Sequence, residues 1–324
     1  MPSRPREADE IARALTAVLG DVLGDVVVSD VSRMPGGSSR ETWSATAVND
    51  AGPRRLVLRR DPPGAPPSGM VLEGTLLAQA SLAGVPVPAV VASGGPGSAL
   101  GSAFVVVDHV EGETLPKRIL RQADADGSGE ALAAQCGSVL AAVHDIDPAA
   151  VPGLAGGDQL EQLRGLHDHL GHAHPAFELA FRHLGATRPA RTGECVVHGD
   201  FRNGNLIVGP DGIRAVLDWE LAHRGDPLED LGWLCVKAWR FGAAPPVGGL
   251  GSIDSLVRGY QGAGGAEVDR EALQWWVMLG TLRWGIICIV QAMTHITGAV
   301  QSVELAAIGR RVCEVEWDLL ELMP

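Results

Sequence analysis

The chain has 324 residues, 46% of them hydrophobic, which is enough for one large core or two packed lobes. Its formal net charge of −13 argues against a nucleic-acid partner, because phosphate backbones are bound by clustered Lys and Arg. The five cysteines are widely spaced without a C-x-x-C pair, so neither a disulfide framework nor a zinc ribbon is expected. We expect them to be reduced core residues of a cytoplasmic protein.

The first predicted elements lie before residue 61. Residues 1–20 lack the uninterrupted apolar segment of a signal peptide. Residues 26–34, 40–48 and 54–60 are rich in β-branched side chains, and turns rich in Gly or Asn-Asp separate them. This pattern predicts three antiparallel strands joined by short connections.

Residues 70–84 predict a helix with an unusual apolar face. On a helical projection Glu73 lies in the middle of that face, which is otherwise formed by Leu72, Leu76, Leu77 and Ala80. A buried carboxylate is costly unless a cation meets it. We therefore expect a cationic partner for Glu73; the alternative is a partly covered face from which Glu73 reaches solvent.

Two further strands, residues 85–93 and 103–110, complete a small β-rich lobe. From Gly112 onward the periodicity is mainly helical, most clearly over residues 131–147. Residues 196–208 and 213–220 predict a β-hairpin around the turn GPDG. The chain is expected to be mostly helical and Trp-rich from Asp226 to its end.

The apolar stretch from Trp275 to Met293 is long enough to suggest a membrane span. Arg283 lies near its middle and would cost about 3 kcal/mol in a bilayer. We therefore expect a buried or interface helix and no membrane span.

A polar constellation interrupts the predicted hairpin. Asp200 precedes Asn205 by five residues, and Asp218 follows at the end of the second strand. Carboxylate and amide oxygens on neighbouring strand ends suit Mg²⁺ and the phosphates it carries. The spacing matches a phosphoryl-transfer site in which an Asp-x-x-x-x-Asn segment provides a base and one metal ligand.

The chain resembles the aminoglycoside phosphotransferase-like branch of the protein-kinase-like superfamily. The resemblance covers nearly the whole chain and rests on GGSSRETW, LVLRR, VPVPAVV, VVHGDFRNGN, VLDWELAHRGDPLEDLGWL and WRFG. It is closest to the kinase-like N-terminal domain of certain acyl-CoA dehydrogenase family members. It implies one α+β, bilobal domain, with a nucleotide-binding N-lobe of five antiparallel strands and a helix over residues 1–110. A mainly helical C-lobe over residues 111–324 would carry the catalytic loop, metal site and acceptor site.

The resemblance also implies roles for individual residues, with ATP and Mg²⁺ as cofactors. Asp200 matches the catalytic Asp, and Asn205 and Asp218 match the Mg²⁺ ligands. The segment Asp108 to Val110 matches the hinge that binds the purine. The phosphate-covering loop corresponds to Gly36, Gly37, Ser38 and Ser39, which depart from the G-x-G-x-x-G pattern.

The ATP-binding Lys of the family is missing. The chain contains only Lys117 and Lys237, and neither lies on the third strand. Period-2 alternation places Val57 and Arg59 on one face of that strand. Val57 would then cover the adenine, while Arg59 would reach the phosphates and meet Glu73.

Arg202 lies two residues after Asp200, where many protein kinases carry a Lys that meets the γ-phosphate. The resemblance implies this role, and an ion pair with an acid such as Glu220 is the alternative. His198 is expected to anchor the loop. Asp226 is expected to cap a helix whose first turn contains Pro227.

Only seven residues separate Asp218 from Asp226, where protein kinases insert a longer peptide-binding segment. The short spacing indicates a small-molecule acceptor with a hydroxyl group. Near-neutral charge between Ala238 and Arg311 favours a non-polycationic acceptor, for which the resemblance suggests a hydroxyacyl-CoA-type compound. An aminoglycoside or other antibiotic is the alternative, and a nucleotide-binding pseudokinase with a scaffold or regulatory role is the alternative of another class. The His-rich segment 167–175 fits no zinc spacing and is interpreted as a solvated helix end.

Overall fold

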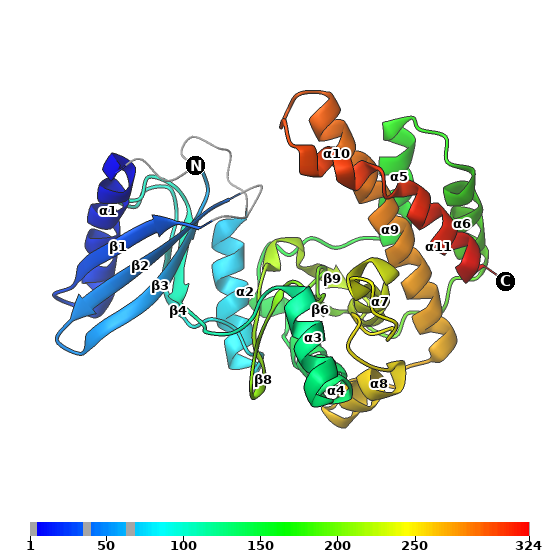
Figure 1. Ribbon diagram of the computed structural model, residues 1–324, viewed down its shortest axis with the longest axis horizontal. Helices are drawn as coiled ribbons and strands as arrows, with labels where there is room; N and C mark the ends of the chain where they lie inside the picture. Colours follow the sequence, from blue (N-terminus) through cyan, green and yellow to red (C-terminus); the bar gives the residue numbers. More distant parts are fainter. Residues whose placement is uncertain (1–4, 35–39, 63–68, 324) are drawn as a thin grey trace. The chain divides into compact units, whose positions relative to one another are not determined.

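The computed structural model describes residues 5–34, 40–62 and 69–323. The chain forms two compact units, whose elements are coloured in chain order in Figure 1. Unit 1 comprises Met1–Gly112, Ala149–Leu154 and Ile207–Glu220, and unit 2 comprises Glu113–Pro148, Ala155–Leu206 and Leu221–Pro324.

Unit 1 is built on a five-stranded antiparallel sheet with the spatial order β1-β2-β3-β5-β4. The strands are β1 (Val27–Arg33), β2 (Glu41–Asn49), β3 (Gly52–Arg60), β4 (Val90–Gly94) and β5 (Phe104–Asp108). The predicted antiparallel sheet is therefore confirmed. Strand β4 begins later than predicted, because Pro86 and Pro88 have no N–H group to donate to a neighbouring strand.

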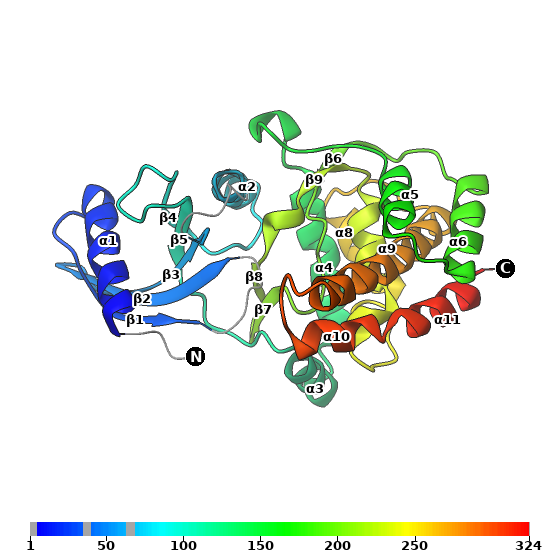
Figure 2. The ribbon, with the colours of Figure 1, turned by 90° about the horizontal axis from the view of Figure 1, so that it is seen from above.

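Helix α1 (Pro5–Leu23) packs on one face of this sheet, chiefly along β1, as Figure 2 shows. Its Ile11, Leu15 and Leu19 are buried in the core shared with the sheet. We did not predict this helix from the sequence, although apolar side chains at every fourth position are a helical signal.

Helix α2 (Met70–Leu82) packs against β4 and β5. Gly74 of this helix lies so close to β5 that a Cβ there would be 3.2 Å from the Val105 side chain. Val105 pairs with Arg59 in the sheet, whereas Leu58 and Val106 belong to the core with α1. Because side chains alternate along a strand, Val57 and Arg59 share the face that carries α2, as the sequence predicts.

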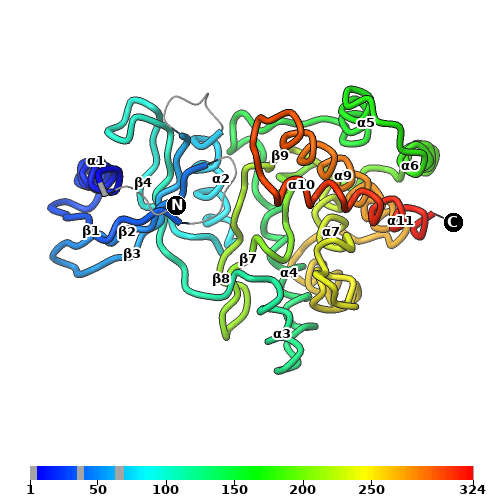
Figure 3. The backbone as a smooth tube through the Cα atoms, turned by 45° about the horizontal axis from the view of Figure 1, so that its top comes forward, coloured from blue at the N-terminus to red at the C-terminus, as the bar shows by residue number. Residues whose placement is uncertain are grey.

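Unit 2 is mainly helical, as predicted, and is centred on the long helix α9 (Figure 3). The helices are α3 (Pro116–Asp126), α4 (Gly129–His144), α5 (Gln159–Leu170), α6 (Pro175–Ala186), α7 (Leu228–Cys235), α8 (Ile253–Gly262), α9 (Arg270–Ile296), α10 (Val303–Gly309) and α11 (Val312–Leu322). Helix α7 crosses α9 closely at Gly232, where a Cβ would meet the Trp276 backbone at 2.7 Å.

Within the described residues, α9 is the one helix long and apolar enough to cross a membrane. Just over half of its most apolar window, 56%, is buried inside the protein. Met278, Leu282 and Ile286 belong to a core shared with α5, α6 and α11. The helix is thus explained as the core helix that the sequence predicts.

Short strands connect the helices near the predicted polar loop. In unit 2, β6 (Cys195–Val197) pairs with β9 (His223–Gly225) in antiparallel register. Strands β7 (Leu206–Gly209) and β8 (Gly212–Val216) form a hairpin around the GPDG turn as predicted, but it is shorter than predicted, because residues 196 and 197 belong to β6. Short 3₁₀ helices lie at η1 (Pro148–Ala150), η2 (Trp219–Leu221) and η3 (Lys237–Arg240).

Four cysteines are buried free thiols, as expected, and burial raises the pKa of both Cys136 and Cys235 to about 12. The expectation of a core position is wrong for Cys313, which is exposed. Helix α11 buries Val315 and Leu319, and Cys313 lies on a different side of that helix.

Candidate active site

Asp200 lies in the loop between β6 and β7 and is held by side chains of unit 2. The indole N–H of Trp233 donates to its Oδ1 at 2.9 Å, and the Asn205 amide donates to its Oδ2 at 2.7 Å. Arg202 Nε lies 3.2 Å from Oδ1. The carboxylate is therefore fixed in one orientation while part of it stays accessible to solvent.

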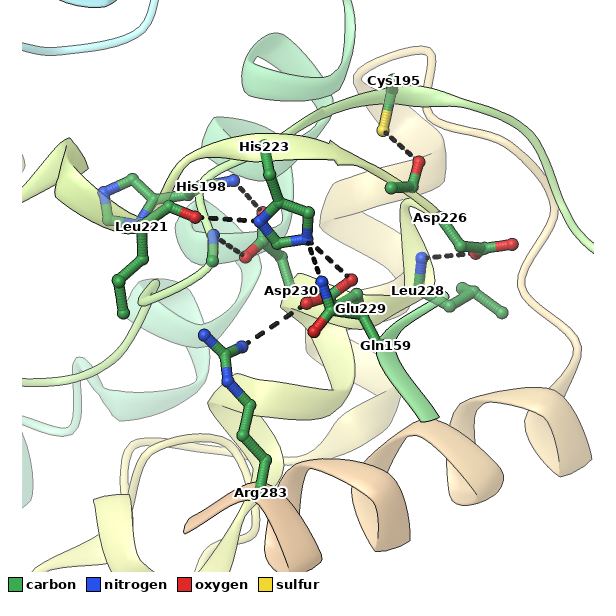
Figure 4. A network of polar contacts seen from close by, with 12 residues as sticks. Gln159, Cys195, His198, Leu221, His223, Asp226, Leu228, Glu229, Asp230 and Arg283 are labelled. Atoms are coloured by element: carbon green, nitrogen blue, oxygen red, sulfur yellow. Dashed lines mark hydrogen bonds and ion pairs between the residues drawn. The ribbon is translucent and has the colours of Figure 1, made fainter. Parts of the chain in front are cut away.

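Asp230 of α7 anchors the start of this loop (Figure 4). The carboxylate of Asp230 accepts the backbone N–H groups of His198 and Gly199 at 2.7 and 2.9 Å, and His144 Nε2 lies 3.3 Å away. Burial acts to raise the pKa of Asp230, but these hydrogen bonds and the nearby His144 outweigh it and lower that pKa. The buried His198 accepts the N–H of Asp200 at its Nδ1, so it anchors the loop as expected.

Gly199 is required where this loop turns. Its φ of +77° is a left-handed conformation, and an added Cβ would lie 2.4 Å from the carbonyl oxygen of Leu221. A side chain is excluded on both grounds. The motif His198-Gly199-Asp200 thus has a geometric reason for each of its residues.

Arg202 lies over an aromatic cluster. Its guanidinium is 4.7 Å from the Trp239 ring, which packs at 5.0 Å against Trp233, and Arg283 lies 4.7 Å from the other indole, Trp233. Because Arg202 also contacts Asp200, its charge is held beside the carboxylate by both interactions.

In unit 1, Glu73 is the centre of an ion-pair cluster. Its buried carboxylate contacts the guanidinium groups of both Arg40 and Arg59. Arg59 Nη2 also lies 3.0 Å from Asp218 Oδ1, and Arg40 Nη1 lies 3.8 Å from Glu220 Oε2. The predicted cation partner Arg59 is therefore present, and the alternative in which Glu73 reaches solvent is wrong.

The charges of this cluster oppose the effect of burial. Burial raises the pKa of Glu73, although Arg59 and Arg40 act in the opposite direction. For Arg59, burial acts to lower the pKa, but Glu73 and Asp218 outweigh it and the pKa is raised. Both groups are thus positioned by their partners' charges as well as by packing.

Two oxygen groups suit a hard cation. Asp218 has a left-handed φ of +68°, which is unusual for a residue other than glycine, and its side chain is 35% exposed. The Asn205 amide nitrogen donates to Asp200, so its amide oxygen is the atom it can offer to a ligand. Both residue types therefore fit Mg²⁺. Asp218 belongs to unit 1 and Asn205 to unit 2.

The predicted purine-binding segment follows β5. The N–H of Asp108 donates to the Ala89 carbonyl, and the N–H of His109 donates to the Arg55 carbonyl. The side chain of Asp108 pairs with Arg54 at 2.6 Å. Val110 is half-buried beside it. The other predicted nucleotide contacts, Gly36, Gly37, Ser38 and Ser39, lie outside the described residues.

The model of the phosphotransferase enzyme family matches residues 30–276, well over half of the chain. The chain belongs to this family.

Curated relatives of this phosphotransferase include acyl-CoA dehydrogenase family member 10 of Mus musculus, 30% identical over 217 residues, or 62% of this chain and 20% of that protein. Family member 11 of Gallus gallus is 34% identical over 169 residues, 47% of this chain and 21% of that protein. The chain thus spans about a fifth of the length of these relatives.

Solved structures share the fold over almost the whole phosphotransferase. A Ralstonia eutropha protein assigned as an aminoglycoside phosphotransferase has a TM-score of 0.71 and 22% identity, covering 99% of both chains. A choline/ethanolamine kinase family protein from Mesorhizobium loti has a TM-score of 0.65 and 18% identity, covering 97% of this chain and 94% of that one. Spectinomycin phosphotransferase, solved with ADP and spectinomycin, has a TM-score of 0.66 and 13% identity, covering 96% and 99%. The kinase-like fold predicted from the sequence is therefore confirmed.

A second polar network of the phosphotransferase involves His223, Glu229 and Arg283 (Figure 4). His223 Nε2 lies 3.1 Å from Glu229 Oε2 and 3.0 Å from Gln159, and Glu229 also contacts Arg283 at 3.4 Å. Asp226 accepts the N–H of Leu228, the first residue of α7, at 3.0 Å, although the N-cap position itself is Pro227 and not Asp226 as predicted. These contacts position α7, which carries both Trp233 and Asp230.

The His-rich segment differs from its prediction. His167 is buried against Phe177 and Phe181, and this burial lowers its pKa, so a solvated helix end is wrong for this residue. One ring nitrogen of His167 and one carboxylate oxygen each of Asp168 and Glu178 lie within 4.8 Å of one another. Arg164 already bridges the two carboxylates, so we assign no metal to this cluster.

Two cavities in unit 2 are lined by both basic and acidic side chains. One of about 420 Å³ is lined by Arg188, Arg191 and Arg224 together with Asp158, Glu194, Asp226 and Glu229. The other, of about 310 Å³, is lined by Trp284 and Trp317, with Lys237 and Arg311 beside Glu314 and Asp318. The first cavity thus has one more acidic than basic side chain, and the second has two of each.

Sequence reasoning missed three residues of this site. Arg40 follows directly after the predicted phosphate loop. A charged residue at the start of an apolar strand could have indicated an ion-pair partner for Glu73. Trp233 and Asp230 lie on α7, a short helix whose residues are all buried. A buried acid and an indole N–H each need a partner, but the sequence does not show which partner.

Proposed function

We propose that this phosphotransferase transfers the γ-phosphoryl group of ATP, with Mg²⁺, to a hydroxyl group of a small molecule. The observation that carries the proposal is the fixed Asp200 carboxylate, held by Trp233, Asn205 and Arg202. ADP in the spectinomycin phosphotransferase structure and GDP in an aminoglycoside 2'-phosphotransferase structure support a nucleotide donor. Residues 1–110 would form the nucleotide-binding lobe and residues 111–324 the catalytic lobe of a cytoplasmic enzyme.

In the proposed mechanism, Asp200 orients the acceptor hydroxyl and takes its proton as the oxygen attacks the γ-phosphorus. The bond from that phosphorus to the bridging oxygen breaks, and ADP leaves. Arg202 and Arg59 would stabilise negative charge on the phosphates. Asn205 and Asp218 would hold Mg²⁺, which neutralises phosphate charge when bound.

The nucleotide base and its phosphates would contact unit 1. Val57 would cover the adenine, and the Asp108–Val110 segment would bind its edge. Gly36, Gly37, Ser38 and Ser39 would cover the phosphates. Glu73 would act through Arg59, because its carboxylate holds that guanidinium.

We propose a non-polycationic acceptor, of which a hydroxyacyl-CoA-type compound is one candidate. The similarity to acyl-CoA dehydrogenase family members 10 and 11 supports this class. The near-neutral charge of the segment from Ala238 to Arg311 also favours an acceptor that is not a polycation. An aminoglycoside or other antibiotic is the second acceptor candidate, supported by the solved structures of similar fold.

Substrate-stimulated ADP release from Mg-ATP, measured across a panel of hydroxyacyl thioesters, amino alcohols and aminoglycosides, tests the proposal. We expect Asp200→Asn to lower the rate roughly 10²- to 10⁴-fold while nucleotide binding persists. Asp211→Asn, an exposed acid on the hairpin turn that pairs with Arg214, is the matched control and should leave the rate unchanged.

A nucleotide-binding pseudokinase is the alternative of another class, and the lack of Lys on β3 favours it. ATP-dependent thermal stabilisation without turnover on any panel member would support that alternative and contradict the enzyme. Stimulated ADP release that Asp200→Asn abolishes would exclude the pseudokinase.

A further inference from the structure

We propose that Arg40 is a positioning residue for nucleotide binding, which keeps Glu73 neutralised while Arg59 turns to the phosphates. The inference rests on the proposed function, because it assigns Arg59 to a bound nucleotide. It concerns a residue that does not itself contact the nucleotide. The observations that carry it are the two guanidinium groups on one buried carboxylate.

The two arginines contact different oxygens of Glu73. Arg40 Nη1 contacts Oε2, and Arg59 Nη1 contacts Oε1. Each oxygen therefore has its own cation, and loss of one contact leaves the other in place. The Glu73 side chain is only 1% exposed, so water cannot replace a lost partner.

The two arginines differ in how accessible they are. The Arg40 side chain is 4% exposed, whereas that of Arg59 is 23% exposed. Only Arg59 can therefore meet a ligand that arrives from solvent. Arg40 contacts the carboxylates of both Glu73 and Glu220, and we infer that it acts through Glu73.

Arg59 is engaged on both sides before a ligand arrives. Its Nη1 contacts Glu73 and its Nη2 contacts Asp218, the proposed metal ligand. If Arg59 turns to phosphate oxygens, it weakens at least one of these contacts. If it were the single cation on Glu73, leaving would strand a buried negative charge. Arg40 removes that penalty, because Glu73 keeps one full ion pair.

A family Lys has one compact charge for both tasks, whereas this chain divides them between two planar guanidinium groups. One arginine stays with the buried acid and the other is free to exchange partners. We therefore expect removal of Arg40 to tie Arg59 to Glu73 and to weaken nucleotide binding.

Calorimetric titration of the full chain with Mg-ADP, without acceptor, tests this role. We expect Arg40→Gln to weaken binding roughly 10- to 100-fold. Arg40→Lys, which keeps the charge, should lose clearly less. The double variant Arg40→Gln/Glu73→Gln should recover affinity to within a few-fold of Glu73→Gln alone, because no buried charge then holds Arg59.

Arg60→Gln is the matched control. Arg60 is equally buried, pairs with Glu41 at 2.8 Å and lies on the opposite face of β3 from Arg59. The Arg60→Gln variant should lower the Tm as Arg40→Gln does, but it should leave the Mg-ADP affinity of the folded protein unchanged.

The outcomes separate the two proposals. Equal affinities of Arg40→Gln, Arg60→Gln and wild type would overturn the role of Arg40 and leave the proposed function standing. A double variant that binds Mg-ADP as weakly as Arg40→Gln would also overturn the role of Arg40. Absence of nucleotide binding by wild type would overturn both proposals.

Discussion

Asp230 and Glu73 are both buried carboxylates, one in each unit, and they are held in different ways. Asp230 accepts two backbone N–H groups and lies beside His144, and these contacts outweigh burial and lower its pKa. Glu73 contacts two guanidinium groups instead, and burial raises its pKa. Backbone amides cannot move without distorting the loop, whereas long arginine side chains can exchange partners. Asp230 thus fixes a loop, whereas Glu73 neutralises arginine side chains that can change partners.

The comparison predicts a large difference in stability between variants at these two positions. Asp230→Ala leaves two backbone N–H groups buried without an acceptor and should lower the free energy of unfolding by about 3–5 kcal/mol. Glu73→Gln should cost clearly less, because Arg40 and Arg59 keep Glu220 and Asp218 as neighbours. Urea unfolding measures both. Equal losses in the free energy of unfolding would contradict the difference between the two carboxylates.

The role of Arg59, the more exposed of the two arginines that contact Glu73, can be tested on ATP binding. Arg59→Ala removes the accessible cation of the Glu73 cluster and should raise the ATP KM roughly 10- to 100-fold. Arg60→Ala should change it by less than about threefold, because its side chain lies on the opposite sheet face. Steady-state kinetics with saturating acceptor measures both values. Equal effects would contradict the assignment of Arg59 to the phosphates.

A third carboxylate, Asp200, sharpens the comparison because a neutral N–H group orients it. Trp233→Phe keeps an aromatic ring near Trp239 and Arg283 but removes the hydrogen bond to Asp200. We expect kcat to fall about 5- to 10-fold with little change in KM for ATP. Trp43→Phe removes an indole N–H that has no partner among the described residues, and it should leave kcat unchanged. A Trp233→Phe enzyme with wild-type kcat would exclude an orienting role for the indole.

The smallest expected effect concerns pH. Burial acts to lower the pKa of His223, but the hydrogen bond and charge of Glu229 outweigh it and raise that pKa above its ordinary value of 6.5. A raised histidine pKa adds stability that is fully present below pH 6.5 and is lost as pH rises through the folded-state pKa. The Tm difference between wild type and His223→Gln should therefore be largest below pH 6.5 and shrink above it. A difference that grows with pH would contradict this sign.

Many features of the fold are predictable because they depend on neighbours along the chain. Alternation along residues 54–60 is enough to place Val57 and Arg59 on one face. Helical periodicity is enough to bury Glu73, and the GPDG turn is enough to join β7 to β8. Each of these follows from local geometry over a few residues.

The contacts of the candidate site are less predictable, because their partners come from distant segments. Arg40 is 33 residues from Glu73, and Trp233 is 33 residues from Asp200. The His167 side chain, expected in solvent, is buried because α6 packs its Phe177 and Phe181 against it. No local pattern shows which buried acid meets which donor.

The sequence by itself determined the strands of the sheet, the helix periodicity, the need of Glu73 for a cation and the residue types of the loop that contains Asp200. Only the tertiary structure decided that Glu73 has two cations, that an indole holds Asp200, and that Asp230 anchors the loop. The physical reason is that backbone conformation responds to neighbouring residues, whereas a buried charge takes its partner from whichever segment packing brings within hydrogen-bond distance.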